Sequence, residues 1–435
     1  MGFSFFTALA PEEQAQGSRD PLGLLPIWSR VGRGLAGNVT TVSGDLRGWT
    51  SLIVMVGLYA DRVAKRVLDE SDTEPLFRAE QLIAYSRVLH SNLEDGSAPV
   101  RGLNLVKRRL QEADNGNRPI PLGLAPDRRI LGAQQSAGVL GQIGSPAIAS
   151  GLLERSRTTL APAGIALWQA AYRPLLRSHD DRITALLKGK VGFEPAQGDA
   201  ELARVLAQLH APALTALERA PLREQVLHGG RGADTAQACF VRLCLQPPAA
   251  ATLAEPCSIV DTILLAEMAR DAGFTDTGRA LQNIVAAERL LSPMVRLFGW
   301  VQGRHRQALA DVVAEVSQIW GQAVRDLDAG TQIVVEHCAE IYSREQIASV
   351  LACSSALAAG HWERALQAVI EINGHVMQRR GGAPWVRIEN GRVDVRLQEG
   401  EALLGNADAL RTEMLHSYYL DPLRRLIHAW RPGEH

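Results

Sequence analysis

Apolar residues recur every three to four positions along most of this chain, which is the spacing that places them on one face of an α-helix. Near the start, the pattern predicts helices over 49–67 and 74–89, which would pack together as a helical hairpin. In the second half it predicts helices over 200–220, 234–245, 258–272, 277–291, 301–327, 333–341, 344–358 and 361–379. The fold class is therefore predicted to be mainly α.

One segment near the C-terminus departs from helical spacing. Residues 385–388 and 392–397 flank Asn390-Gly391, a dipeptide that is strongly preferred in two-residue hairpin turns. The sequence therefore predicts one short β-hairpin here. Two strands are marginally stable by themselves, so we expect the hairpin to pack on helices or to join further strands.

The central stretch 124–176 changes its pattern several times. Asp127 is a suitable N-cap for a first helix that Gly144 would end, and Ser145-Pro146 has the order of cap residue and proline that begins a second helix. Residues 158–160 favour a short β segment, and Pro162 would begin a third, longer helix. Two short helices, a tight turn, an extended piece and a longer helix follow one another in the order of a winged helix-turn-helix.

The phrase LAPAG at 160–164 resembles the L-T-P-x-G sequence that often follows the wing in bacterial regulators of the MarR type. The resemblance implies a winged-helix-like module at 124–190, between an N-terminal helical region (1–123) and a C-terminal helical bundle (191–435) that carries the hairpin near 385–397. The segment 247–256, rich in Pro and Ala, is the best candidate for a linker. Winged helices bind DNA, bind RNA or dock proteins, so the fold alone does not decide the function.

Composition narrows the class of protein. The chain has 435 residues, 46 % of them hydrophobic, which is enough for two to four folded domains. The longest apolar run, 52–60, is about half of what a membrane-spanning helix needs, and no basic residue precedes the apolar N-terminal run as in a signal peptide. Five cysteines without a C-x-x-C pair indicate reduced thiols. We therefore expect a cytoplasmic protein that does not bind membranes; its arginine-rich basic residues are typical of a GC-rich bacterial genome.

The net charge of −1 provides no general attraction to nucleic acid, so any such binding needs a local cluster of cations. A basic segment precedes the central module, and polar residues remain within it once its apolar face is assigned. Arg and Gln side chains can form hydrogen bonds with base edges, and a Ser at a helix N-terminus can help to bind a phosphate. The predicted nucleic-acid-binding residues are Lys107, Arg108, Arg109, Arg128, Arg129, Gln134, Gln135, Ser145, Arg155, Arg157, Lys188 and Lys190. The second predicted helix has almost no base-reading side chains, so we expect contacts to the DNA backbone.

Catalytic motifs give no comparable signal. No nucleophile elbow, zinc-protease motif, phosphate-binding loop or dinucleotide fingerprint occurs in a suitable context. His179, Asp180 and Asp181 superficially resemble part of the metal site of HD phosphohydrolases, but that family also needs an upstream His and a distant Asp on facing helices, which the pattern does not present. His305 and His337 are isolated candidates without converging partners. We predict no catalytic residue, no metal and no cofactor.

These observations favour a non-enzymatic, DNA-associated component of a larger bacterial complex, with double-stranded DNA and other protein subunits as partners. The chain is similar in type to accessory proteins encoded in restriction and phage-defence loci, which implies a role in anti-phage defence or genome maintenance. Two alternatives remain: a scaffold whose winged helix docks proteins only, and an enzyme whose site is assembled from distant helices. A basic stripe, an exposed apolar patch or a pocket of converging ionisable groups would distinguish the three.

Overall fold

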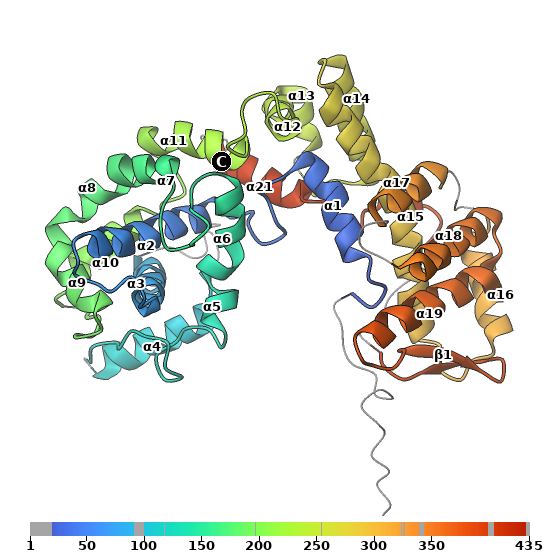
Figure 1. Ribbon diagram of the computed structural model, residues 1–435, viewed down its shortest axis with the longest axis horizontal. Coiled ribbons are helices and arrows are strands. Elements are labelled where there is room, and N and C mark those ends of the chain that lie inside the picture. Colours follow the sequence, from blue (N-terminus) through green and yellow to red (C-terminus); the bar gives the residue numbers. More distant parts are fainter. Residues whose placement is uncertain are drawn as a thin grey trace, which may run out of the picture. The chain divides into compact units, whose positions relative to one another are not determined.

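The computed structural model is mainly helical, and its described part holds one two-stranded antiparallel sheet (Figure 1). This confirms the predicted fold class, mainly α with a single short hairpin. The structure describes residues 20–90, 100–116, 118–195, 197–253, 255–322, 324, 327–338, 343–398 and 404–431. In this part of the chain, no helix is both long enough and apolar enough to cross a lipid bilayer.

The chain forms two compact units. The first combines residues 1–35 and 251–418, and the second combines residues 36–250 and 419–435. One boundary, between 250 and 251, falls inside the predicted linker, where the short helix α13 (Pro247–Thr252) lies. The segment 124–190, predicted as a module of its own, belongs to the second unit.

The helix α2 (Leu46–Ala64) is the centre of the second unit. Its residues are buried from Leu46 to Tyr59, all around the helix and not on one face only. Such a helix must be covered on every side by other elements. Two glycines let these neighbours come close: a Cβ on Gly48 would lie 2.6 Å from Cδ1 of Ile143, and a Cβ on Gly57 would lie 2.4 Å from the ring of Trp168.

The elements packed around α2 come from the whole second unit. α3 (Glu74–His90) and α6 (Val139–Ala149) pack directly on α2, and α3 in turn contacts α4 (Leu103–Gly116), α9 (Asp180–Leu187) and α10 (Ala200–Gln208). The remaining helices are α5 (Gln134–Ala137), α7 (Pro162–Leu167), α8 (Arg173–Leu176), α11 (Ala216–Leu222), α12 (Ala236–Cys244) and α21 (Leu420–Trp430), with a π-helical turn at Trp168–Tyr172 and another at Arg223–Leu227.

The central stretch differs from its predicted elements in two places. Residues 127–133 form turns, so the first helix of this stretch begins only at Gln134. α6 then continues through Gly144, Ser145 and Pro146, where we predicted a break. The burial of Ile143, Gly144 and Pro146 in α6 accounts for this, because packing against α2 offsets the helix-breaking tendency of proline.

The later elements of the stretch agree with the prediction. Residues 150–161 form a tight turn closed by an antiparallel bridge between Leu153 and Leu160, and α7 begins at Pro162. Trp168 and Tyr172 are buried as expected, whereas Leu175 is 53 % exposed. The winged-helix assignment itself stays a prediction.

The first unit is built around the long helix α15 (Thr275–Gln302), which continues through Ser292-Pro293, beyond the predicted end at residue 291. Residues 303–308 then separate it from α16 (Leu309–Trp320), so the predicted helix 301–327 is shorter. The predicted helix 333–341 lies within α17 (Asp328–Cys338) as far as it is described; 339–341 lie outside the described residues. The other helices are α1 (Leu25–Leu35), α14 (Ile259–Asp271), α18 (Arg344–Ala359), α19 (Trp362–Arg379) and α20 (Ala409–Thr412).

The predicted hairpin is confirmed as β1 (Val386–Glu389) and β2 (Arg392–Val395). Asn390 and Gly391 have φ angles of 52° and 71°, the left-handed values that this turn requires. Backbone hydrogen bonds from Arg306 to Val393, and from Val393 to Gln307, add the segment before α16 to the edge of β2. The hairpin therefore joins a further extended segment, as expected because an isolated two-stranded hairpin is only marginally stable.

Candidate functional site

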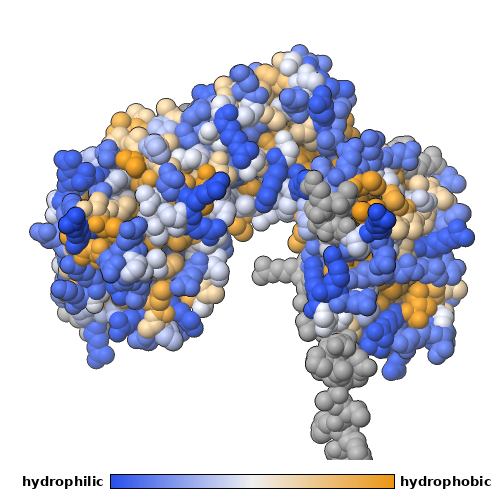
Figure 2. All heavy atoms as spheres, viewed as in Figure 1, coloured by the Kyte–Doolittle hydropathy of each residue, from blue (hydrophilic) through white to orange (hydrophobic). Residues whose placement is uncertain are grey.

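The predicted nucleic-acid-binding cations lie mostly on the surface of the second unit. Arg109 and Arg129 are half-buried, and the others are exposed: Lys107, Arg108, Arg128, Arg155, Arg157, Lys188 and Lys190. On the face drawn in Figure 2, hydrophilic residues dominate and apolar residues form small separate groups.

Contacts bring part of this set together next to α3. Arg109, on α4, donates a hydrogen bond to the backbone carbonyl of Arg128 and thereby fixes the turn at 124–129 beside α4. The backbone N–H of Leu124 in turn donates to Oε1 of Glu74, in the first turn of α3, at 3.1 Å. The 124–129 turn therefore contacts the start of α3, and Arg109 joins it to α4, which reaches α3 further along the helix at Tyr85.

The turn that follows α9 lies at the same end of α3. Arg78 pairs with Glu74 at 3.1 Å and donates to the carbonyl of Leu187 at 2.7 Å. A Cβ on Gly189 would lie 2.9 Å from the guanidinium carbon of Arg78, so this turn contacts that side chain directly. Lys188 and Lys190 are thus joined to the same surface. We call Lys107, Arg108, Arg109, Arg128, Lys188 and Lys190 the basic surface.

Few acidic groups neutralise the basic surface. Arg108 pairs with Glu112 at 3.5 Å, both side chains being 66 % exposed, and Arg128 lies 3.7 Å from Asp127. Exposed pairs of this kind contribute only about 0–1 kcal/mol and exchange readily for another anion. Lys107, Lys188 and Lys190 form no ion pair with any residue that the structure describes. The cations of this surface are therefore available to bind phosphates.

The three predicted residues Ser145, Arg155 and Arg157 form a separate group. Arg157 donates from Nη2 to Oγ of Ser145 at 2.9 Å, which links the 150–161 turn to α6. Ser145 lies in the middle of α6 and not at a helix N-terminus, so the expected phosphate site of that kind is wrong. No described contact connects this group with the basic surface.

The prediction for Gln134 is also wrong. Gln134 is 2 % exposed, and its side-chain amide is fully used inside the unit. Its Nε2 donates to Oε2 of Glu80 at 2.9 Å, and its Oε1 accepts from Nε2 of Gln81 at 3.0 Å. No part of this amide remains to read a base. Gln135, its neighbour on α5, is exposed.

Two residues weighed for catalysis have structural partners instead. Asp180 begins α9 and accepts hydrogen bonds from Lys65 at 2.8 Å and from Arg62 at 3.1 Å, which ties α9 to the end of α2. Nδ1 of His305 accepts a hydrogen bond from the backbone N–H of Val395 at 3.0 Å and so supports the hairpin. Among the described residues, no group of three or more His, Cys, Asp or Glu is arranged to hold a metal ion.

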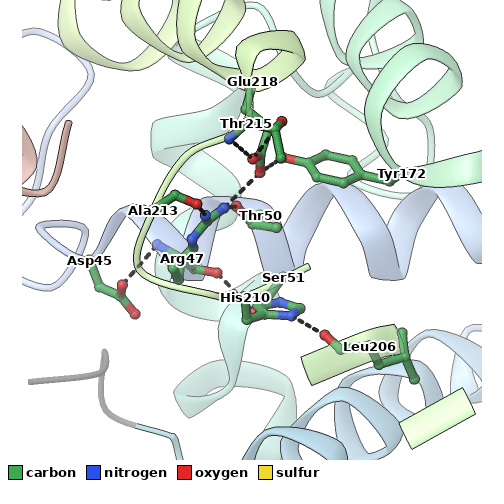
Figure 3. Close-up of polar contacts among 10 residues, drawn as sticks. All are labelled: Asp45, Arg47, Thr50, Ser51, Tyr172, Leu206, His210, Ala213, Thr215 and Glu218. Atoms are coloured by element: carbon green, nitrogen blue, oxygen red, sulfur yellow. Dashed lines mark hydrogen bonds and ion pairs between the residues drawn. The ribbon is translucent and has the colours of Figure 1, made fainter. Parts of the chain in front are cut away.

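A buried polar network that the sequence did not predict lies along α2 (Figure 3). Arg47 donates to Oε1 of Glu218 at 2.7 Å and to the carbonyl of Ala213 at 2.8 Å. Tyr172 donates its hydroxyl to the same Glu218 oxygen at 3.0 Å, and both the backbone N–H and the hydroxyl of Thr215 donate to the other carboxylate oxygen. The side chains of Arg47 and Glu218 are 7 % and 3 % exposed, so water does not screen this ion pair.

Ser51 and His210 form a second part of the network (Figure 3). Nδ1 of His210 lies 2.7 Å from the carbonyl of Leu206, which can only accept, so Nδ1 carries a proton. Burial, and next the charge of Arg87, lower the pKa of His210 well below its usual range, so the ring is neutral and Nε2 has no proton. Nε2 therefore accepts from the hydroxyl of Ser51 at 2.9 Å.

Ionisable groups also converge on a small cavity beside this pair. Asp45 and Glu80 line it with Arg87 and Arg101, and burial raises the pKa of both carboxyl groups while it lowers the pKa of both guanidinium groups. The cavity has a volume of only about 30 Å³, the share of one water molecule in the liquid. It is too small for a substrate, and we interpret the cluster as part of the core.

The neutral His210 predicts a pH dependence of stability. Its pKa is lowered in the folded state, so its contribution is present above the unfolded pKa of about 6.5 and is lost as the pH falls, by up to about 1.4 kcal/mol per pH unit. Between pH 7.5 and 5.5, urea unfolding should show that the native protein loses about 1 kcal/mol more stability than His210→Asn. The raised pKa values of Asp45 and Glu80 act in the opposite direction in both proteins, so the comparison isolates His210. Equal losses would contradict a neutral, buried ring.

A larger cavity opens between the last turns of α3 and α4, and its volume is about 440 Å³. Apolar side chains such as Leu89 and Leu110 line it together with the polar residues Gln111, Arg118 and Glu194. Gln111 lies one helical turn after Lys107 of the basic surface, so the cavity and this surface are neighbours on α4.

Comparisons of the chain with models of known families, with curated proteins and with solved structures gave no match. What the site can do therefore has to follow from its own residues. Those residues are the basic surface and the cavity beside it, because the buried network along α2 leaves no room for a ligand.

Proposed function

We propose that this protein binds double-stranded DNA through its sugar-phosphate backbone, at the basic surface. One observation carries the proposal: contacts through Glu74, Arg78 and Arg109 bring cations from α4, the 124–129 turn and the turn after α9 together along α3. Lys and Arg side chains placed in this way neutralise phosphates independently of the base sequence. Gln134, the buried candidate for base reading, takes no part.

The wider function that we propose is that of a non-enzymatic component of a bacterial complex. The winged-helix-like stretch at 124–190 contributes Arg128, Lys188 and Lys190 to the basic surface, which supports DNA binding by this stretch. From the resemblance in type to accessory proteins of phage-defence loci, we further propose that such a complex acts in anti-phage defence or genome maintenance, in the cytoplasm.

A salt titration tests the proposal. Changing Lys107, Arg128, Lys188 and Lys190 to Ala should weaken binding to random-sequence duplex DNA and reduce the slope of log K against log salt concentration by about 3 to 4. The matched control changes Arg279, Arg344, Arg364 and Arg379 of the first unit to Ala; these side chains are also exposed, and the net charge changes equally. No binding at low salt, or an equal loss in both variants, would contradict DNA binding at the basic surface.

A second candidate function is protein docking by the same stretch. Ile165 on α7 and Leu175 on α8 are 40 % and 53 % exposed, so a partner that covers them would remove apolar surface from water. If a partner protein binds here, Ile165→Asp with Leu175→Asp should abolish its co-purification, whereas the four-residue variant of the basic surface should retain it. The reverse pattern would exclude this candidate.

A further inference from the structure

We infer that the cavity between α3 and α4 accepts the base of one nucleotide, whose phosphate then lies on the adjoining cations of the basic surface. This inference rests on the proposed DNA binding and adds a specific site to it. The ligand is a nucleoside monophosphate unit, which either a free nucleotide or a nucleotide displaced from bound DNA can supply.

The cavity has a size and lining that suit a base. Its volume of about 440 Å³ lies within the roughly 300–1,000 Å³ of typical small-ligand sites. Leu89, Leu110 and Ala113 provide apolar surface from the two helices, and Pro119 and Pro195 add more from the two loops. Leu89 is 41 % exposed although it is a large apolar residue, so an occupant would remove its surface from water.

The polar groups at the cavity supply both donors and acceptors. Gln111 and Arg118 have no side-chain hydrogen bond or ion pair with any residue that the structure describes, so their donors are available. Glu194 adds a carboxylate acceptor, and its ion pair with Arg182 is long, at 3.9 Å. Apart from the imidazole of His90, the lining has one cation, Arg118, and one anion, Glu194, and this balance suits an uncharged heteroaromatic base and not a phosphate.

The phosphate would lie outside the cavity, on the cations. Lys107 precedes Gln111 by four residues on α4, so both project from the same face, about 6 Å apart along the helix. A base held beside Gln111 therefore places its phosphate within reach of the Lys107 ammonium.

Two sets of contacts hold described residues of the cavity lining in place. Ile120 and Phe193 exchange two backbone hydrogen bonds of 2.8 Å, which hold Pro119 against the segment that carries Glu194. Asp199, whose side chain is fully buried, accepts two hydrogen bonds from Arg182 at 2.6 and 2.7 Å and one from the backbone N–H of Glu194 at 2.7 Å. A preformed site of this kind loses little entropy when it is filled.

Two binding measurements on the full chain test the inference. Calorimetry with AMP, GMP, CMP and TMP measures capture of a free nucleotide, with ribose 5-phosphate as the ligand that lacks a base. Fluorescence of a duplex that contains 2-aminopurine measures displacement of a base from the stack. We expect a response in at least one measurement and none with ribose 5-phosphate.

Variants assign that response to the cavity. Ala113→Trp fills it and should weaken nucleotide binding or reduce the fluorescence change at least tenfold; Asn104→Trp, on an exposed part of α4, is the control. Gln111→Ala with Arg118→Ala removes the donors without adding volume and should have an effect in the same direction. The inference would be overturned if neither measurement gave a response while duplex DNA still bound. It would also be overturned if Ala113→Trp gave the same response as the native protein. If the native protein does not bind duplex DNA at all, the proposed function is overturned instead.

Discussion

Replacing Glu218 with alanine is expected to lower the free energy of unfolding of the second unit by about 3–5 kcal/mol, the range for breaking a buried ion pair. Without Glu218, the guanidinium of Arg47 stays in the core with hydrogen bonds only to Thr50 and the carbonyl of Ala213. The hydroxyl of Tyr172 and the backbone N–H of Thr215 lose their acceptors as well. The hydroxyl of Thr215 loses its acceptor too, so the cost is that of a buried charge and of three donors without their acceptor.

Urea unfolding measures this loss, and hydrogen exchange of peptides from α2 and α11 assigns it to the second unit. The matched control is Glu112→Ala, because Glu112 pairs with Arg108 at the surface, and we expect no measurable change. Arg47→Met combined with Glu218→Leu should recover part of the lost stability, since both charges are then removed together. If Glu218→Ala unfolds like the control, water reaches this pair and the network is not a buried one.

The elements that could be predicted from the sequence are those set by local chemistry. The turn at Asn390-Gly391 was predictable because few other dipeptides adopt two left-handed residues without strain. Most long helices were predictable from the spacing of their apolar residues. α6 and α15 were not, since both continue through a proline that local rules treat as a break. In each helix, the burial of the surrounding residues outweighs the local preference.

The candidate site was predictable only in part, because exposure cannot be read from residue type. Lys107 and Lys188 belong to the basic surface as expected, whereas Gln134 has the same polar character but is buried. The ion pair of Arg47 with Glu218 joins positions far apart in the chain, so only the tertiary fold reveals it. One local signal existed: Thr215 followed three residues later by Glu218 is the pattern of a helix cap.

Replacing Glu288 with alanine is expected to destabilise the first unit by about 2–4 kcal/mol, because each buried donor left without a partner costs about 1–3 kcal/mol. Glu288, in the middle of α15, is fully buried. Its carboxylate accepts from the backbone N–H groups of Leu415 and His416 and, at 2.8 Å, from Nδ1 of His416. It thereby holds the segment after α20 against α15.

Glu288→Gln should cost less than Glu288→Ala, since the amide oxygen still accepts from the backbone and the His416 ring can exchange its tautomer to accept from the amide nitrogen. Both losses should appear in hydrogen exchange of peptides from α15 and from residues 413–418, and Glu267→Ala on the exposed side of α14 serves as the control. The expected order of stability is Ala, Gln, native, because glutamine keeps the volume of the side chain and an acceptor oxygen, whereas alanine keeps neither. Equal losses in the two variants would mean that the negative charge, and not the hydrogen bonds to Leu415 and His416, stabilises this segment.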